Sequence, residues 1–81
     1  MQPIGEFVLG AVADACNLER SGMRETMALA DIGFDSLSAA SFTFLVESSY
    51  GIELKEDDVV ALYEAQTVKD VIALTERLVP S

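Results

Sequence analysis

The sequence predicts an all-α fold: a bundle of four helices with a long loop between the first two helices and a short third helix. Three observations predict this fold. Apolar residues recur at helical spacing in four segments, no segment alternates between apolar and polar residues as a strand does, and the 81 residues are 51% apolar, which suits one small core. We therefore expect a single domain over residues 1–81.

The first helix is expected to begin at Ile4. From there an apolar stripe follows one helix face through Val8, Ala11, Val12, Ala15 and Leu18. Pro3 is compatible with a helix start because an amide in the first turn has no intrahelical acceptor, and Asn17 is a suitable end.

Residues 17–35 show no sustained period and contain Gly22 and Gly33, so they predict a long irregular connection. Connections longer than about 12–15 residues are commonly functional or disordered. Four spaced apolar residues favour a loop that packs against the core: Met23, Met27, Leu29 and Ile32.

The second helix is expected to run from the residue after Asp35 to Tyr50. Asp35 is a good N-cap because its carboxylate can accept backbone N–H bonds and lies at the positive end of the helix dipole, and Gly51 predicts the end. Two adjoining apolar stripes follow this helix, one of Ala39, Phe42, Val46 and Tyr50 and the other of Leu37, Ala40, Phe44 and Leu45. One stripe can face the core while part of the other faces outward.

Two shorter helices are expected after it. Residues 56–64 carry acidic side chains in their first turn and apolar side chains behind them, which predicts a short third helix. Thr67 and Asp70 resemble a capping box, and the apolar stripe that follows predicts a fourth helix ending near Pro80.

The composition limits the partners. Fourteen acidic side chains stand against five basic ones, a net charge of -9, so we expect basic proteins as partners, no nucleic acid and no membrane insertion. The longest mostly apolar stretch, residues 7–13, is much shorter than the roughly 20 residues that span a bilayer. Cys16 is the single cysteine, which excludes an internal disulfide and favours a cytoplasmic location, and we expect it to be a small buried hydrophobe.

Enzyme chemistry has little support in these residues. The chain contains no histidine, so a serine would lack an imidazole base and a Cys/His zinc site is excluded. Asp31, Gly33 and Asp35 resemble the start of a calcium loop, but Ser36 stands where that loop needs glycine and Phe42 where it needs glutamate. We expect no catalytic residue and no metal site.

Residues 33–37 read Gly-Phe-Asp-Ser-Leu and place Ser36 at the first helical position behind an acidic cap. An ordinary helix-start residue is the simpler interpretation of this serine. The rest of the chain favours a different interpretation. Residues 50–54 read Tyr-Gly-Ile-Glu-Leu, and together with the serine motif and the order and spacing of the helices they make the chain resemble the acyl carrier protein family. The resemblance covers nearly all of the 81 residues. The resemblance implies the acyl-carrier-like four-helix bundle and a monomeric, stand-alone carrier.

In that family a phosphopantetheinyl transferase uses coenzyme A and Mg²⁺ to attach a 4'-phosphopantetheine arm to the serine of this motif. The resemblance therefore implies that Ser36 is the attachment point. A helix N-terminus suits the phosphodiester anion because it presents free N–H groups and the positive end of the dipole. The thiol of the arm then holds acyl groups as thioesters for acyl-transferring or condensing enzymes, and the carrier is not itself an enzyme.

The resemblance also implies that the second helix meets these enzymes. The matching positions of the contact face are Asp35, Leu37, Ala40, Ser41, Phe44 and Glu47. Periodicity alone leaves Phe44 open between a binding anchor and a core residue, because both stripes are apolar. The resemblance favours an exposed Phe44.

The second helix departs from carriers of bacterial fatty-acid synthesis, which place several acidic residues along it. Here Ser38, Ser41, Ser48 and Ser49 stand at or near those places, and Glu47 is the acidic residue that remains. A less charged face implies less basic partners, so we expect a specialised, polyketide-like or related biosynthetic pathway. A housekeeping fatty-acid carrier and an aminoacyl carrier are the alternatives.

Two functions of other classes are the rivals. A cofactor-free acidic helical adaptor that binds one partner through Phe44 explains the charge and the second helix but leaves the serine motif accidental. A small hydrolase acting through Ser36 lacks a base and a second oxyanion donor.

Overall fold

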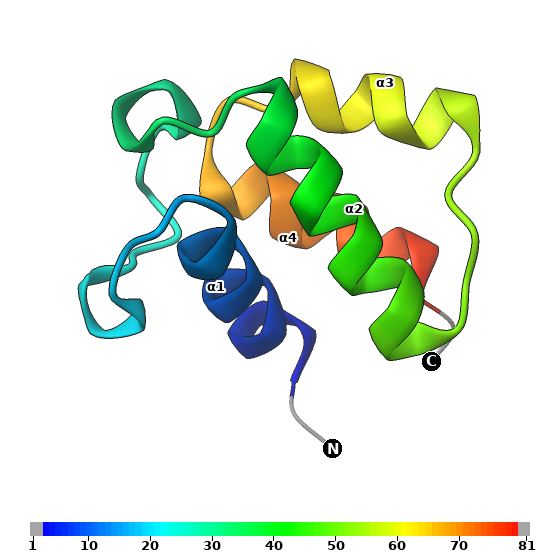
Figure 1. Ribbon diagram of the computed structural model, residues 1–81, viewed down its shortest axis with the longest axis horizontal. Helices are drawn as coiled ribbons and strands as arrows, with labels where there is room; N and C mark the ends of the chain where they lie inside the picture. Colours follow the sequence, from blue (N-terminus) through cyan, green and yellow to red (C-terminus); the bar gives the residue numbers. More distant parts are fainter. Residues whose placement is uncertain (1–2, 80–81) are drawn as a thin grey trace.

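The structure, a computed structural model, describes residues 3–79. Its four α-helices are α1 (Ile4–Ala15), α2 (Ser36–Tyr50), α3 (Glu56–Glu64) and α4 (Val68–Leu78), and two 3₁₀ helices, η1 (Arg20–Gly22) and η2 (Leu29–Ile32), lie in the loop between α1 and α2 (Figure 1). Between residues 3 and 79 there is no strand, apart from a single β-bridge that joins Ala28 to Thr67. The predicted all-α bundle with a long first loop and a short α3 is confirmed.

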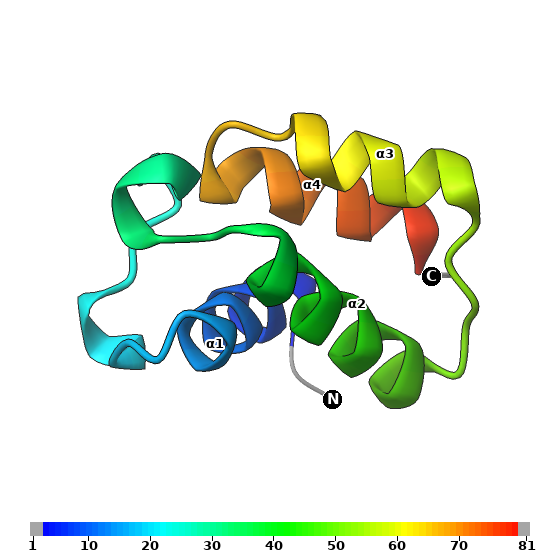
Figure 2. The same ribbon diagram turned by 45° about the horizontal axis from the view of Figure 1, so that its top comes forward.

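The helices form two layers. α1 packs against both α2 and α4, and α3 contacts α2 and α4. Figure 2 shows α1 and α2 in the lower layer and α3 with α4 in the upper one. In both views α2 lies between α1 and α3, so its two flanks face different neighbours.

The core lies where the inward faces of these helices meet. The largest fully buried side chains are Phe42, Leu62, Val8, Val12, Val46, Val68, Val71 and Thr75. The ring of Phe42 meets that of Phe34 edge to face, with 6.2 Å between the centroids. Thr75 is a buried polar residue, and its hydroxyl donates to the carbonyl of Val71 at 2.8 Å, so its polar atom is satisfied.

The ends of α1 and α2 follow the predicted signals. α1 ends at Ala15, and Asn17 just beyond it has φ 58, in the left-handed region that asparagine tolerates better than most residues. Leu18, expected to continue the apolar stripe, lies outside the helix and is exposed, because the chain has already turned away. α2 ends at Tyr50, where Gly51 takes φ 65 and its N–H donates to the carbonyl of Glu47 at 2.9 Å.

α3 spans the predicted residues, and α4 begins with the predicted capping box. The Thr67 hydroxyl accepts from the Asp70 N–H at 3.3 Å, and the Asp70 carboxylate accepts from the N–H groups of Gln66 and Thr67 at 3.1 Å each. The hydrogen bonds from Gln66 and then Thr67 lower the pKa of Asp70. The predicted end near Pro80 falls outside the described residues, within which α4 ends at Leu78.

The long loop packs against the core, as predicted. Met23 and Leu29 are buried, and Met27 and Ile32 are half-buried against the core. The loop is also tied to the α3–α4 turn, because the Leu29 N–H donates to the carbonyl of Gln66 at 2.8 Å and the Val68 N–H donates to the carbonyl of Met27 at 3.0 Å. These bonds hold η2 beside the start of α4 and close to the start of α2.

The two phenylalanines of α2 should differ in their effect on stability. Phe42 is 2% exposed and Phe44 is 68% exposed. Phe42→Ala is expected to lower the free energy of unfolding by about 3–5 kcal/mol because it opens a cavity in the core, whereas Phe44→Ala should change it by less than about 0.5 kcal/mol. Urea unfolding followed by circular dichroism measures both, and equal losses would contradict the burial pattern.

Candidate functional site

The start of α2 is built by a short turn. Gly33 has φ 75, a conformation that favours glycine, and its carbonyl accepts from the Asp35 N–H at 3.0 Å. The Asp35 carboxylate then accepts from the Ser38 N–H at 3.0 Å, as the predicted N-cap, and the Asp35 carbonyl accepts from the Ala39 N–H at 2.8 Å. The turn and the cap together place Ser36 at the first position of α2.

The carboxyl group of Asp35 is held in its charged form. The hydrogen bond from the backbone N–H of Ser38 lowers the pKa of Asp35 below its ordinary value. Asp35 is exposed, so its negative charge is available at the surface next to Ser36.

Ser36 itself is exposed, and no hydrogen bond within residues 3–79 uses its side chain. It is one of the residues that line a surface hollow of about 470 Å³. Side chains of three elements line this hollow: Leu29 and Ala30 of η2, Ser36 and Ala39 of α2, and Leu62 and Tyr63 of α3, with Phe34, Ala65 and Gln66. The hydroxyl of Ser36 is therefore free, and a group attached to it could occupy the adjacent hollow.

The amino-acid sequence does not predict this hollow. Its walls come from residues 28–30, 34–36, 39, 62–63 and 65–66, which are far apart in the sequence, and the loop among them is hydrogen-bonded to the α3–α4 turn. Several wall residues are alanines, but scattered small residues have no period that would single them out in the sequence.

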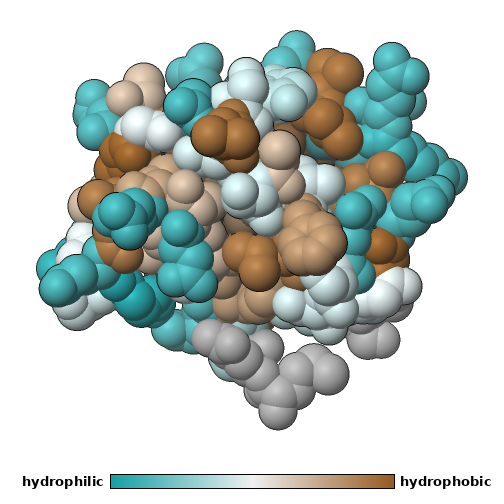
Figure 3. Space-filling model, in the orientation of Figure 1, coloured by the Kyte–Doolittle hydropathy of each residue, from teal (hydrophilic) through white to brown (hydrophobic). Residues whose placement is uncertain are grey.

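Most residues of the predicted contact face of α2 are exposed. Leu37 is 77% exposed and Phe44 is 68% exposed, and Ala40 and Ser41 are exposed between them. The expected exposure of Phe44 is confirmed, while its stripe neighbour Leu45 is half-buried against the core. Apolar side chains also reach the surface between polar ones on the face shown in Figure 3.

Glu47 differs from the expectation of an exposed face residue. It is half-buried, and its carboxylate accepts from the Leu54 N–H at 2.9 Å, so it holds the α2–α3 connection. Its carbonyl also accepts from the N–H groups of Gly51 and Ile52. The reason is that the chain reverses after Gly51 and brings Leu54 back beside the end of α2.

Ser38 also departs from the expected face. It is 7% exposed, and its hydroxyl donates to the carbonyl of Gly33 at 3.3 Å. Ser41, Ser48 and Ser49 are the exposed serines of the four. Cys16 was expected to be buried, but it is half-buried against the core, and burial raises the pKa of its thiol.

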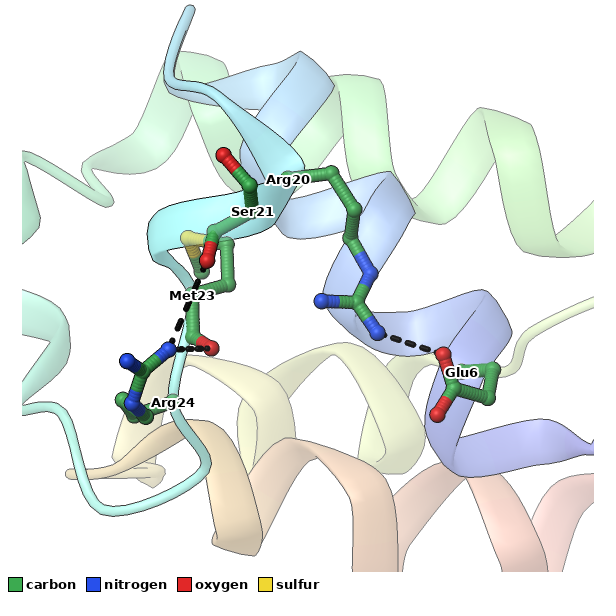
Figure 4. Close-up of polar contacts among 5 residues, drawn as sticks. All are labelled: Glu6, Arg20, Ser21, Met23 and Arg24. Carbon is green, nitrogen blue, oxygen red and sulfur yellow. Dashed lines mark hydrogen bonds and ion pairs between the residues drawn. The ribbon is translucent and has the colours of Figure 1, made fainter.

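The arginines of the first loop are engaged within the chain. Figure 4 shows Arg20 pairing with Glu6, and Arg24 donating to the carbonyls of Met23 at 3.1 Å and Ser21 at 3.5 Å. Among residues 3–79, no group of three or more His, Cys, Asp or Glu side chains could hold a metal ion. In the same range, no helix has the length and apolar character needed to cross a bilayer.

Part of the chain matches a known protein family. The model of a family described as "Phosphopantetheine attachment site" matches residues 6–75 of the 81. The matched segment begins in α1, ends in α4 and includes the start of α2. No curated protein matches the chain.

The N-cap charge should make stability depend on pH in one direction. The hydrogen bond from Ser38 lowers the pKa of Asp35 in the folded chain. The ionised carboxylate therefore stabilises the fold fully at a pH above the pKa of an unfolded aspartate, about 3.9. This stabilisation is lost as the pH falls through the lower pKa of the folded chain. Asparagine also caps helices but has no charge. The stability difference between the native chain and Asp35→Asn should therefore shrink below about pH 4.

Urea unfolding of both chains from about pH 7 down to about pH 3 measures this difference. The other carboxylates are common to the two chains, so their titration cancels to first order. A difference that stays constant over this range would contradict the role of the Asp35 charge.

Proposed function

The chain belongs to the phosphopantetheine attachment-site family, whose members are carriers with a covalent 4'-phosphopantetheine, and we propose that Ser36 carries this arm in an acyl carrier protein. One observation carries the assignment to Ser36: an exposed serine hydroxyl stands at the first position of α2, behind the Asp35 cap and beside a hollow of about 470 Å³.

The residues at this position fit the group. The Ser38 amide is bonded to the Asp35 carboxylate, whereas no hydrogen bond within residues 3–79 uses the amide of Ser36. The N-terminus of the 15-residue α2 therefore has a free N–H group that can bond to a phosphodiester on Ser36. The positive end of the helix dipole also favours the negative charge of that phosphodiester. Other serines fit less well, because Ser38 is buried and Ser41 lies inside the helix.

Ser36 supplies the nucleophile for attachment. Its Oγ forms a bond to the phosphorus of coenzyme A that bears pantetheine, the pyrophosphate P–O bond breaks, and adenosine 3',5'-bisphosphate leaves. The hydroxyl proton passes to a base of the transferase, since the chain has no histidine of its own. Once attached, the arm supplies a thiol that holds acyl groups as thioesters.

The exposed side of α2 is proposed as the face that meets acyl-transferring or condensing enzymes. It consists of Asp35, Leu37, Ala40, Ser41 and Phe44, whereas Glu47 is half-buried and its carboxylate is bonded to the Leu54 N–H. Leu37 and Phe44 are large apolar side chains in water, and their burial by a partner is favourable.

A specialised, polyketide-like or related pathway is the proposed setting. Glu47 is the single acidic residue of α2 and is bonded to the α2–α3 connection, so the contact face carries charge at Asp35 and is otherwise uncharged. Such a face selects less basic partners than a row of carboxylates would. We also propose a monomeric single domain over residues 1–81 that acts in the cytoplasm and is not an enzyme; a fatty-acid or aminoacyl carrier is the alternative.

Attachment at Ser36 is tested by intact mass. After incubation with coenzyme A, Mg²⁺ and a broad-specificity phosphopantetheinyl transferase, the native chain should gain the mass of one phosphopantetheine, and Ser36→Ala should gain none. Ser49→Ala, which removes an exposed hydroxyl near the other end of α2, should gain it like the native chain. If none of the three chains gains mass while a control carrier does, a cofactor-free adaptor that binds through Phe44 becomes the better explanation.

The pathway assignment is tested by exchange with a fatty-acid synthase acyltransferase. The arm-bearing chain is expected to accept acyl groups at least about tenfold more slowly than a housekeeping carrier, because its α2 lacks free carboxylates for a basic surface. Equal rates for the two carriers would contradict the specialised pathway and favour the fatty-acid alternative.

A further inference from the structure

A second surface hollow lies on the other flank of α2. It is an open groove of about 500 Å³ between the end of α1 and the middle of α2. Its lining residues are Asp14, Ala15, Ala40, Ser41, Phe44 and Leu45. Three of them have small side chains, Ala15 on one helix and Ala40 and Ser41 on the other, so nothing fills the space between the two helices at this point.

The groove has an apolar side formed by α2. Two of its lining residues are apolar side chains of α2: Phe44, which is 68% exposed, and Leu45, which is half-buried. An apolar side chain that entered the groove would contact both and remove the ring of Phe44 from water. The occupant is therefore expected to present an apolar side chain.

The α1 end of the groove has an uncompensated negative charge. Asp14 is exposed, and its carboxylate has no hydrogen-bond or ion-pair partner within residues 3–79. It lies in the last turn of α1, which contains no basic residue and where the helix dipole is already negative. The arginines of the following loop are bonded elsewhere, Arg20 to Glu6 and Arg24 to backbone carbonyls. A lysine or arginine from outside is the complementary group.

The position of the groove relates it to Ser36. Ser36, Ala40 and Phe44 are spaced by four residues and follow one side of α2, so each step covers about 6 Å along the helix axis. The hollow beside Ser36 is lined instead by η2 and α3, and α3 lies on the other flank of α2 from α1 (Figure 1). A protein seated in the α1–α2 groove can thus reach Ser36 without covering that hollow.

We propose that the α1–α2 groove is the docking site of the phosphopantetheinyl transferase, which places an apolar side chain against Phe44 and a lysine or arginine against Asp14. The inference rests on the proposed function, because the transferase is the enzyme that must reach Ser36. The transferase binds the chain before the arm is attached, so its affinity for the chain comes from contacts with the protein surface. The acyl-transferring and condensing enzymes act after attachment and can also bind the arm and the acyl group on it. Docking of the transferase therefore includes α1 as well as α2.

The first test compares initial rates of arm attachment at increasing carrier concentration. Asp14→Lys should raise KM about tenfold and leave kcat within about twofold, because it replaces an attraction with a repulsion but leaves Ser36 in place. Glu76→Lys is the matched control, since it makes the same change in net charge at an exposed position on α4 and should leave KM unchanged. Equal KM values for the two variants would overturn the proposal.

The second test detects docking without the reaction. Isotope-labelled Ser36→Ala chain, which has no hydroxyl to modify, is titrated with the transferase, and the amide resonances are followed. The largest shifts should include Asp14, Ala15 and Ala40, and exceed those of Tyr63 and Gln66. Shifts at α3 with none at Asp14 and Ala15 would overturn the α1 contact.

The two proposals can fail separately. A native chain that gains no arm contradicts the role of Ser36. A native chain that gains the arm, with Asp14 resonances unmoved by the transferase, contradicts only the docking groove.

Discussion

The hydrogen bond from the Ser38 N–H to the Asp35 carboxylate determines where α2 begins, and most of the molecule depends on that register. Successive residues of a helix point about 100° apart, so a start displaced by one residue would rotate every side chain of α2 relative to its neighbours. With the observed start, Phe42 enters the core, Phe44 points to solvent, and Ser36 is at the first position. One capping interaction thus places a core residue, a surface residue and the candidate attachment point.

The long first loop has an equally specific role. Its bonds to the α3–α4 turn bring η2 beside the start of α2 and the end of α3, and small side chains leave the hollow next to Ser36 between them. On the other flank, small residues of α1 and α2 leave the groove that contains Phe44. α2 consequently separates two spaces, one beside the hydroxyl of Ser36 and one beside an exposed aromatic ring, which permits an attached arm and a docked enzyme to occupy different sides.

The distribution of charge follows from which carboxylates are used inside the chain. Asp35 and Asp70 accept backbone N–H bonds at helix starts, and Glu47 accepts one from the α2–α3 connection. Asp14 has no such partner within residues 3–79 and lies where the helix dipole is unfavourable to it. A net charge of -9 alone therefore says little about partners, because carboxylates that bond within the chain differ from those left for an external cation.

The sequence by itself determined the helices, the starts of α2 and α4, the end of α2 and the serine motif, because these depend on local signals: Asp35 and Thr67 as caps, Gly51 as a stop, and apolar residues at helical spacing. Only the tertiary structure decided which apolar stripe of α2 is buried, since both stripes have the same period and α1, α3 and α4 select between them. It also decided that Glu47 bonds to Leu54 and that two hollows flank α2. Those features join residues far apart in the chain, and their geometry exists only once the helices have packed.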